Sequence, residues 1–197
     1  MFDHRLRPLV DRPLHALARP LPLTANQVTI GGFATGLLAV PAIATGWFSL
    51  ALITIGLNRL ADGLDGALAR RDGPTDFGAY LDIVLDFLFY SAVPFAFVLY
   101  NPANGPYAAF LIFSFIATGT TFLAFSALAA HRGLTTELRG KKSIYYLGGL
   151  TEGFETIVAL CLMCIAPAYF WLISSIFGIM CWITAATRIA VAREQFS

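Results

Sequence analysis

The stretch Asp62-Gly-Leu-Asp65-Gly66-Ala-Leu-Ala69-Arg70 is followed, after seven residues, by Gly78-Ala-Tyr-Leu-Asp82-Ile-Val-Leu-Asp86. These two segments place four aspartates at helical spacing inside otherwise apolar sequence. An ionised carboxylate at the centre of a membrane helix costs roughly 2.5–3.5 kcal/mol even on lenient insertion scales. Four such groups therefore need a strong compensating partner, and a divalent metal ion supplies one.

The surrounding chain has the composition of a membrane protein. Of its 197 residues, 57% are hydrophobic and 13% are charged, with a mean hydropathy of +0.71. Soluble domains contain about 45–50% apolar and about 25% charged residues. A helix needs ~20 residues to cross about 30 Å of hydrocarbon, and six stretches have that length: about 26–48, 50–70, 75–100, 106–130, 145–167 and 169–190. We therefore expect an all-α, polytopic membrane protein with six transmembrane helices.

Outside these spans, lysine and arginine are confined to alternate connections. They precede the first span, lie between spans two and three and between spans four and five, and follow span six. Because basic residues favour the cytoplasmic side, we expect an integral protein of the cell (inner) membrane with both termini and the aspartate-bearing turn in the cytoplasm. The formal net charge of +1 conceals this asymmetry, and no basic run indicates nucleic-acid binding.

The chain divides into a short N-terminal segment, residues 1–23, and a six-helix membrane domain, residues 24–197. Within the first segment an apolar stripe can form from Leu9, Val10, Leu14, Leu17 and Leu21. Such a stripe is typical of an amphipathic helix lying along the membrane interface. A disordered basic tail is the alternative.

The two carboxylate pairs have spacings that let them share one volume. Asp62 and Asp65 are three residues apart and Asp82 and Asp86 four apart, so each pair lies on one helix face. The tight turn around Asp72-Gly73-Pro74 predicts that the two helices are antiparallel neighbours. Oxygen-only ligation favours two Mg²⁺ or Mn²⁺ ions, while ligand type alone leaves Ca²⁺ open. Such ions suit substrates that carry phosphates.

Small residues accompany the acids. Gly63, Gly66, Ala69 and Gly78 open space in which a bulky group can approach the backbone, although small residues also favour close helix packing in membranes. Arg70 lies at the predicted membrane edge, where its guanidinium can reach a phosphate. A purely topological role is the alternative for this arginine.

The stretch resembles the signature of the CDP-alcohol phosphotransferase (phosphatidyltransferase) family, D-x2-D-G-x2-A-R-x8-G-x3-D-x3-D. The matching positions are Asp62, Asp65, Gly66, Ala69, Arg70, Gly78, Asp82 and Asp86. One departure is that seven residues rather than the commoner eight separate Arg70 from Gly78, which alters the turn rather than the aspartate faces. The resemblance implies transfer of a phosphatidyl group from CDP-diacylglycerol to a small alcohol, with release of CMP, in phospholipid biosynthesis.

The resemblance also implies a role for each matching residue. Two Mg²⁺ or Mn²⁺ ions would be held by Asp62, Asp65, Asp82 and Asp86, and Asp86 would be the general base for the acceptor hydroxyl. Arg70 would stabilise the charge of the departing CMP. The cytidine site would be lined by Gly66, Ala69 and Gly78. Asn26 would be a further nucleotide contact, with plain capping of its helix as the alternative. A homodimer is expected for the family.

The choice of acceptor stays open at this level. Arg139, Lys141 and Lys142 could receive a phosphate on the acceptor or serve as positive-inside anchors. Glu152 and Glu155 could pair with Arg59 or Arg188, or hydrogen-bond a polyol, and Arg59 could instead salt-bridge Asp62 or help to bind substrate. A polyol phosphate such as inositol phosphate or glycerol phosphate is the favoured acceptor, with serine or free inositol as alternatives. The rival classes are a membrane cation transporter and a scaffold without activity.

Overall fold

The structure, a computed structural model, describes residues 13–133 and 149–197. The described residues form helices and no strand, which confirms the all-α prediction. The α-helices are α2 (Ala25–Leu37), α3 (Ala39–Ala44), α4 (Phe48–Asp72), α5 (Asp76–Tyr100), α6 (Gly105–His131), α7 (Gly153–Ile165) and α8 (Phe170–Phe196). Three of the predicted acceptor-binding residues lie outside the described residues: Arg139, Lys141 and Lys142.

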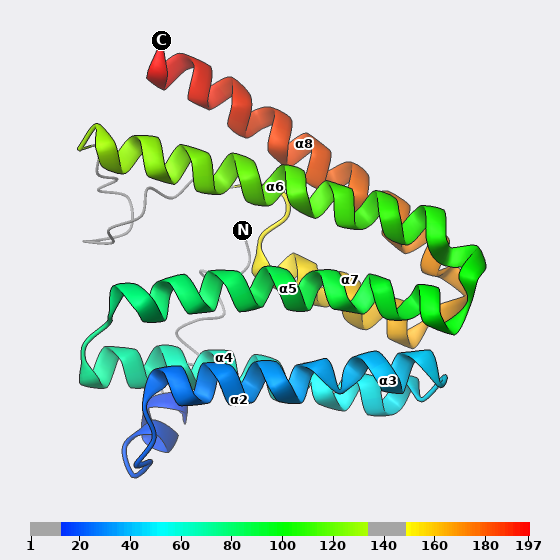
Figure 1. Ribbon diagram of the computed structural model, residues 1–197, viewed down its shortest axis with the longest axis horizontal. Helices are drawn as coiled ribbons and strands as arrows, with labels where there is room; N and C mark the ends of the chain where they lie inside the picture. The colour runs from blue at the N-terminus through cyan, green and yellow to red at the C-terminus, as the bar shows by residue number, and fades with distance from the viewer. Residues whose placement is uncertain (1–12, 134–148) are drawn as a thin grey trace.

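The helices run roughly along one direction, with their connections gathered at two opposite ends (Figure 1). The helices α2 and α4 pack closely against each other, α3 packs on α4 and α5, and α7 packs on α4, α5 and α8. On the other side of α5, α6 and α8 pair along much of their length (Figure 1). A core of phenylalanine and aliphatic side chains joins the α6–α8 pair to the other helices. It includes Phe89, Phe97, Leu111, Leu160 and Phe170.

Within residues 13–133 and 149–197, four helical segments are long and apolar enough to cross a membrane: 25–44, 76–100, 102–131 and 167–196. The structure thus supports a polytopic membrane protein. The helix α4 is 25 residues long, but charged side chains interrupt its C-terminal half. At 13 residues, α7 is shorter than the predicted fifth span, since its length of about 20 Å falls below about 30 Å of hydrocarbon. Six spans therefore stay a prediction.

The start and the end of α7 have local causes. A capping box forms at its N-terminus, where the Glu152 side chain accepts from the backbone of Glu155 and the Glu155 side chain accepts from the Glu152 N–H. Such reciprocal bonds satisfy donors that have no partner within the first turn. At the other end, Pro167 follows the final residue of the helix closely and begins a short 3₁₀ turn, Pro167–Tyr169.

The predicted second and third spans, α4 and α5, are joined by the expected turn but make few direct contacts with each other. The turn contains Gly73 at φ +97°, and Thr75 caps α5 by accepting from the Gly78 N–H at 3.0 Å. Instead of packing together, both helices pack on α2. Across the space between them, Arg59 of α4 donates to Asp86 of α5 at 2.8 Å. The two helices are therefore neighbours, as the turn predicted, and polar side chains connect them.

A short helical segment, residues 13–18, packs on α4 behind the aspartate motif. Leu14 and Ala18 are buried there, and a Cβ at Gly63 would lie 2.7 Å from Leu14 Cδ1, so this glycine serves packing. Arg71 of α4 holds the end of this segment, because its guanidinium donates to the carbonyls of Ala18 at 2.6 Å and Leu21 at 3.1 Å. The position of this segment along a membrane interface stays a prediction.

Exposed tryptophan and tyrosine side chains gather at the end of the molecule opposite the α4–α5 turn. Five of them flank the connections α3–α4, α5–α6 and α7–α8: Trp47, Tyr100, Tyr107, Tyr169 and Trp171. Two other exposed ones lie elsewhere, Tyr80 near the start of α5 and Trp182 within α8. Tryptophan and tyrosine are enriched where membrane hydrocarbon meets the polar interface. This end of the molecule, which we call the aromatic end, therefore has the character of an interfacial boundary.

The close approach of α2 and α4 predicts opposite effects for two adjacent glycines. A Cβ at Gly32 would overlap Ala61 Cβ, whereas a Cβ at Gly31 would meet open space. We expect Gly32→Ala to lower the free energy of unfolding by about 1–3 kcal/mol, the usual cost of overpacking. Gly31→Ala should be neutral or stabilising by up to about 1 kcal/mol, since alanine favours helices. Thermal unfolding of the two variants in detergent checks this, and equal melting temperatures would contradict it.

Candidate functional site

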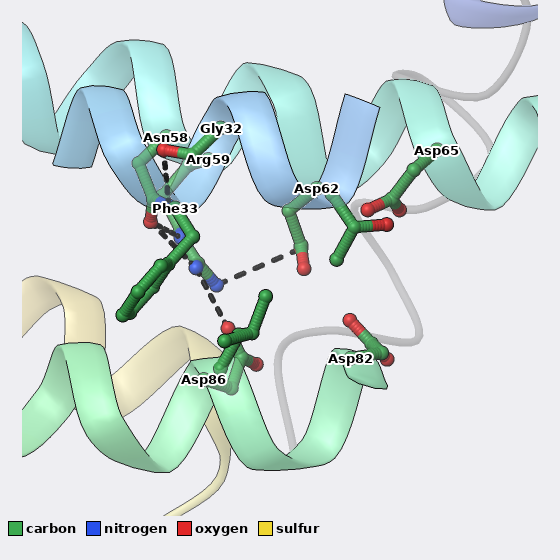
Figure 2. A pocket seen from close by; sticks show the side chains of 10 residues that line it. Gly32, Phe33, Asn58, Arg59, Asp62, Asp65, Asp82 and Asp86 are labelled. Carbon is green, nitrogen blue, oxygen red and sulfur yellow. Dashed lines mark hydrogen bonds and ion pairs between the residues drawn. The ribbon is translucent and has the colours of Figure 1, made fainter. Parts of the chain in front are cut away.

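The four motif aspartates lie around one pocket between α2, α4 and α5 (Figure 2). Asp62 and Asp65 extend from α4, and Asp82 and Asp86 from α5, so that the two pairs face each other as the spacing predicted. The wall contributed by α2 includes Gly32 and Phe33. The full lining is Thr29, Gly32, Phe33, Asn58, Arg59, Asp62, Asp65, Asp82, Leu85 and Asp86.

Three of the aspartates are close enough to share an ion. One carboxylate oxygen from each of Asp62, Asp82 and Asp86 lies within 4.8 Å of the other two. Oxygens on opposite sides of a Mg²⁺ ion are about 4.2 Å apart, twice the usual bond length. Asp82 is exposed while the other two are half-buried, so an ion would be reached from the Asp82 side.

Asp65 stands beside this group rather than within it. Its side chain is buried, at 7% exposure, and its Oδ2 has no hydrogen-bond partner among the described residues. Burying an ionised carboxylate oxygen without a partner is costly. A cation in the pocket would supply that partner, so Asp65 fits the donor set of hard oxygen ligands that Mg²⁺ and Mn²⁺ prefer.

Arg59 is the cation that the structure places among these carboxylates. Its Nη1 lies 3.6 Å from Asp62 Oδ2, so the salt bridge within α4 that the sequence offered as one alternative is present. Its Nη2 also donates to Asp86 Oδ1 at 2.8 Å, a contact between helices that the sequence did not predict (Figure 2). The guanidinium thus links the two sides of the pocket.

Three further residues of the site were missed from the sequence. Asn58 accepts from Arg59, and Gly32 offers its carbonyl to Asn58 Nδ2 at 3.0 Å. Tyr90 donates its hydroxyl to Asp86 Oδ2 at 2.8 Å. A signal existed for Tyr90, which is four residues after Asp86 and hence on the same helix face. Asn58 was visible as a polar residue in an apolar stretch, whereas nothing in the sequence pointed to Gly32.

The other predicted site residues form two small groups near the pocket. A Cβ at Gly78 would lie 3.0 Å from Asn26 Oδ1, so the motif glycine and the candidate nucleotide contact are neighbours. On α4, a Cβ at Gly66 would lie 3.4 Å from Arg70 Nη1. The exposed Arg70 donates through Nε to His15 Nε2 at 3.3 Å. The cap of α2 is made by Thr24 rather than Asn26, which removes plain capping as the reason for this asparagine.

Three residues that the sequence singled out remain: Glu152, Glu155 and Ala69. The predicted acceptor-binding Glu152 caps α7, as described above, and the structure gives Glu155 a part in the same cap. Ala69 is half-buried on α4, one residue before Arg70. The pocket thus combines a group of carboxylates, a fixed guanidinium and an exposed edge at Asp82, which is suited to binding divalent cations and, through them, a phosphate-bearing substrate.

Comparison with known proteins agrees with this geometry. Residues 22–190 match the family model for CDP-alcohol phosphatidyltransferase. Inner membrane protein YnjF of Escherichia coli (strain K12) is 50% identical over 193 residues, which span 96% of this chain and 94% of that protein. Archaetidylinositol phosphate synthase of Pyrococcus horikoshii is 36% identical over 99 residues, or 48% of this chain and 53% of that protein.

Solved structures share the fold. The crystal structure of Mycobacterium tuberculosis phosphatidylinositol phosphate synthase (PgsA1) with CDP-DAG bound has a TM-score of 0.67 and 24% sequence identity. The match covers 91% of this chain and 92% of that one. The same enzyme in complex with manganese and citrate also matches, with a TM-score of 0.67 and coverage of 90% and 87% respectively.

Proposed function

Because the chain belongs to the CDP-alcohol phosphatidyltransferase family, and a solved structure of the same fold holds manganese, we propose that it is a metal-dependent transferase. It moves the phosphatidyl group of CDP-diacylglycerol to a phosphorylated polyol. CMP is the other product. The observation that carries this proposal is the gathering of Asp62, Asp82 and Asp86 around one pocket within apolar helices. Such a site can hold a charged phosphate group next to a lipid that remains in the bilayer.

We assign a different role in the reaction to each group of pocket residues. Asp86, which two donors hold in place, takes the proton from the acceptor hydroxyl. The acceptor oxygen then bonds to the phosphorus that bears the diacylglycerol, and the bond between that phosphorus and the oxygen of CMP breaks. Asp62, Asp65, Asp82 and Asp86 would hold Mg²⁺ or Mn²⁺, which would screen the charge of the pyrophosphate and of the departing CMP.

The nucleotide half of the donor would lie beside the carboxylates. Gly66 and Ala69 on α4 and Gly78 on α5 would line it, with Asn26 beside Gly78 and Arg70 beside Gly66. Arg70 is exposed at the end of α4, where it would meet the phosphate of CMP. These placements support a cytidine site at the membrane surface, with the acyl chains in the bilayer.

Two kinds of observation favour a phosphorylated acceptor. Basic residues crowd the connection before α7, including Arg139, Lys141 and Lys142. The relatives and solved neighbours include synthases whose names state an inositol phosphate lipid as product. Serine and free inositol carry no phosphate and would leave these basic groups without a role in acceptor binding.

The same proposal includes the topology. Six spans with the α4–α5 turn in the cytoplasm would place the basic residues of that turn and of both termini on one side. The described residues agree with this division, since Arg70, Arg71, Arg132 and Arg193 lie near the end of the molecule opposite the aromatic end. An N-terminal interfacial helix and a homodimer complete the proposal as family-level expectations.

Product analysis on purified protein tests the reaction and the acceptor together. The protein is given CDP-diacylglycerol, Mn²⁺ or Mg²⁺, and separately inositol phosphate, glycerol phosphate, inositol or serine. We expect CMP and a new phosphorylated lipid with one of the two phosphorylated acceptors. A lipid formed only from serine or inositol would contradict the acceptor class but not the reaction. No CMP with any acceptor, from protein that is folded and binds metal, would overturn the proposed donor.

A further inference from the structure

Arg59 bridges two carboxylates that belong to different helices. Its Nη2 donates to Asp86 Oδ1 on α5 at 2.8 Å, and its Nη1 lies 3.6 Å from Asp62 Oδ2 on α4. The side chain is largely covered, with 20% of its surface exposed. Because α4 and α5 make few direct contacts, this ion pair is a main polar connection between the two halves of the aspartate motif.

The guanidinium is itself held in one orientation. Its Nε and Nη2 donate to Asn58 Oδ1 at 2.9 and 2.6 Å, and Asn58 Nδ2 donates to the Gly32 carbonyl of α2 at 3.0 Å. The rings of Phe89 and Tyr90 each lie 5.6 Å from the guanidinium carbon, within the range of attraction between a cation and an aromatic ring. A chain of contacts thus runs from the backbone of α2 through Asn58 and Arg59 to Asp86.

Tyr90 holds the second oxygen of Asp86 and also contacts Arg59, whose Nη1 donates to the Tyr90 hydroxyl at 3.4 Å. Its hydroxyl donates to Asp86 Oδ2 at 2.8 Å, and its side chain is buried. Each oxygen of Asp86 therefore accepts one hydrogen bond, which fixes the plane of the carboxylate. Since each carboxylate oxygen can accept about two bonds, one position on each oxygen remains for a substrate proton or a metal ion.

Arg59 also changes the charge of the site. The residues lining the pocket include four carboxylates and, among the described side chains, this one guanidinium. A fixed positive charge a few ångströms from the carboxylates opposes the binding of another cation. The guanidinium thus orients Asp86 and at the same time weakens the attraction that the site exerts on divalent ions.

We propose that Arg59 and Tyr90 are positioning residues for Asp86, and that Arg59 in addition lowers the affinity of the pocket for divalent cations. The positioning half rests on the function proposed above, whereas the half about metal affinity does not. The competing explanation is a counter-ion that serves folding alone. That explanation predicts weaker or unchanged metal binding when Arg59 is replaced, and ours predicts tighter binding together with slower turnover.

The test uses three variants of the full chain in detergent: Arg59→Met, Arg59→Lys and Tyr90→Phe. Matched controls are Arg132→Met, whose guanidinium binds the carbonyls of Gln195 and Phe196 at the end of α8, and Tyr100→Phe at the aromatic end. Mn²⁺ binding is titrated by electron paramagnetic resonance without donor or acceptor. The kcat and the KM for CDP-diacylglycerol are measured separately with saturating Mn²⁺.

For Arg59→Met we expect Mn²⁺ to bind about 3–10-fold more tightly, because a repelling charge is removed. Its kcat should fall about 10–100-fold, because Asp86 is no longer held in its orientation. The KM should stay within about threefold, because substrate binding does not depend on Arg59. Arg59→Lys should bind Mn²⁺ within about twofold of wild type and recover only part of kcat, because an ammonium keeps the charge without the planar fork. Tyr90→Phe should lower kcat about 10–150-fold, the cost of losing a hydrogen bond to a charged group, and leave Mn²⁺ affinity within about twofold. The variant also removes the longer bond of 3.4 Å that the Tyr90 hydroxyl accepts from Arg59 Nη1.

Unchanged or weaker Mn²⁺ binding in Arg59→Met would overturn the role in metal affinity. Wild-type kcat in Arg59→Lys and Tyr90→Phe would overturn the positioning role, and these two variants decide that point if Arg59→Met does not fold. In that case a fourth variant, Arg59→Gln, is titrated with Mn²⁺, because it removes the charge and keeps a polar side chain. A wild-type protein without turnover on any acceptor would instead show that the proposed function is wrong, while the Mn²⁺ titrations would still decide the electrostatic half.

Discussion

Asp86→Asn is expected to lower kcat by about 10³-fold, within the range that a positioned general base contributes. The amide has nearly the shape of the carboxylate, and its oxygen can still accept from Arg59 or Tyr90, so the pocket should keep its structure. What the variant loses is the basic oxygen that takes the acceptor proton. The measurement is CMP release with saturating CDP-diacylglycerol, acceptor and Mn²⁺.

A conservative change on the same helix provides the control. Asp76 lies in the first turn of α5 and does not line the pocket, so Asp76→Asn should retain turnover within about threefold. Binding of CDP-diacylglycerol to Asp86→Asn should remain detectable, because the other three aspartates and Arg70 are intact. Near-normal turnover of Asp86→Asn would remove Asp86 from the role of base and leave it as a metal ligand.

Removal of divalent ions should lower turnover at least as much, by about 10³-fold or more, since four carboxylates then face a pyrophosphate with little compensating charge. Re-addition of Mn²⁺ or Mg²⁺ should restore activity. Ca²⁺ should restore less, because its longer bonds and higher coordination number suit a larger and more flexible site. The measurement is CMP release from protein treated with EDTA and then dialysed, with the residual metal content determined.

Metal binding itself can be followed on the same samples. We expect Asp82→Asn to weaken Mn²⁺ binding by at least about tenfold, since its oxygen is one of three that lie together. Asp76→Asn should bind Mn²⁺ as the wild type does. Full turnover in protein shown to be free of divalent metal would refute the proposed metal dependence, whatever the Mn²⁺ titrations give.

The sequence could predict that the two aspartate pairs face each other, because this arrangement depends only on the helical period and on one short turn. Residues three or four apart share a helix face, and Gly73 with Pro74 reverses the chain. The salt bridge from Arg59 to Asp62 followed from the same rule and is present. These are local relations, so the order of residues along the chain contains nearly all the information needed.

The contacts that cross between helices were not predictable in the same way. The bond from Arg59 to Asp86 joins residues 27 apart, and that from Asn58 to the Gly32 carbonyl joins residues 26 apart. Both depend on how α2, α4 and α5 pack around the pocket, including the close approach of Gly32 to Ala61. A glycine in an apolar helix has several explanations, and only the packed structure distinguishes them.

The length of α7 shows a third case, in which a usable signal was present in the sequence. Glu152 and Glu155 have the spacing of a capping box, which predicts a helix start at Gly153. Hydropathy alone favoured an earlier start, because the residues around 145–150 are apolar or small. The sequence interpretation treated these acids as pairing or binding groups and overlooked that they cap the start of α7.

The aromatic end has a consequence for the depth of the aspartates in the bilayer. Trp47, Tyr100, Tyr107, Tyr169 and Trp171 anchor that end at one interface, so the level of every other atom is measured from there. Thinning or thickening of the hydrocarbon layer, which costs only fractions of a kcal/mol per Å of mismatch, then moves the opposite lipid surface relative to the pocket. The acyl chain length of the host membrane therefore sets the depth of Asp86 below the lipid surface, and with it the distance that a water-soluble acceptor must travel to reach this carboxylate.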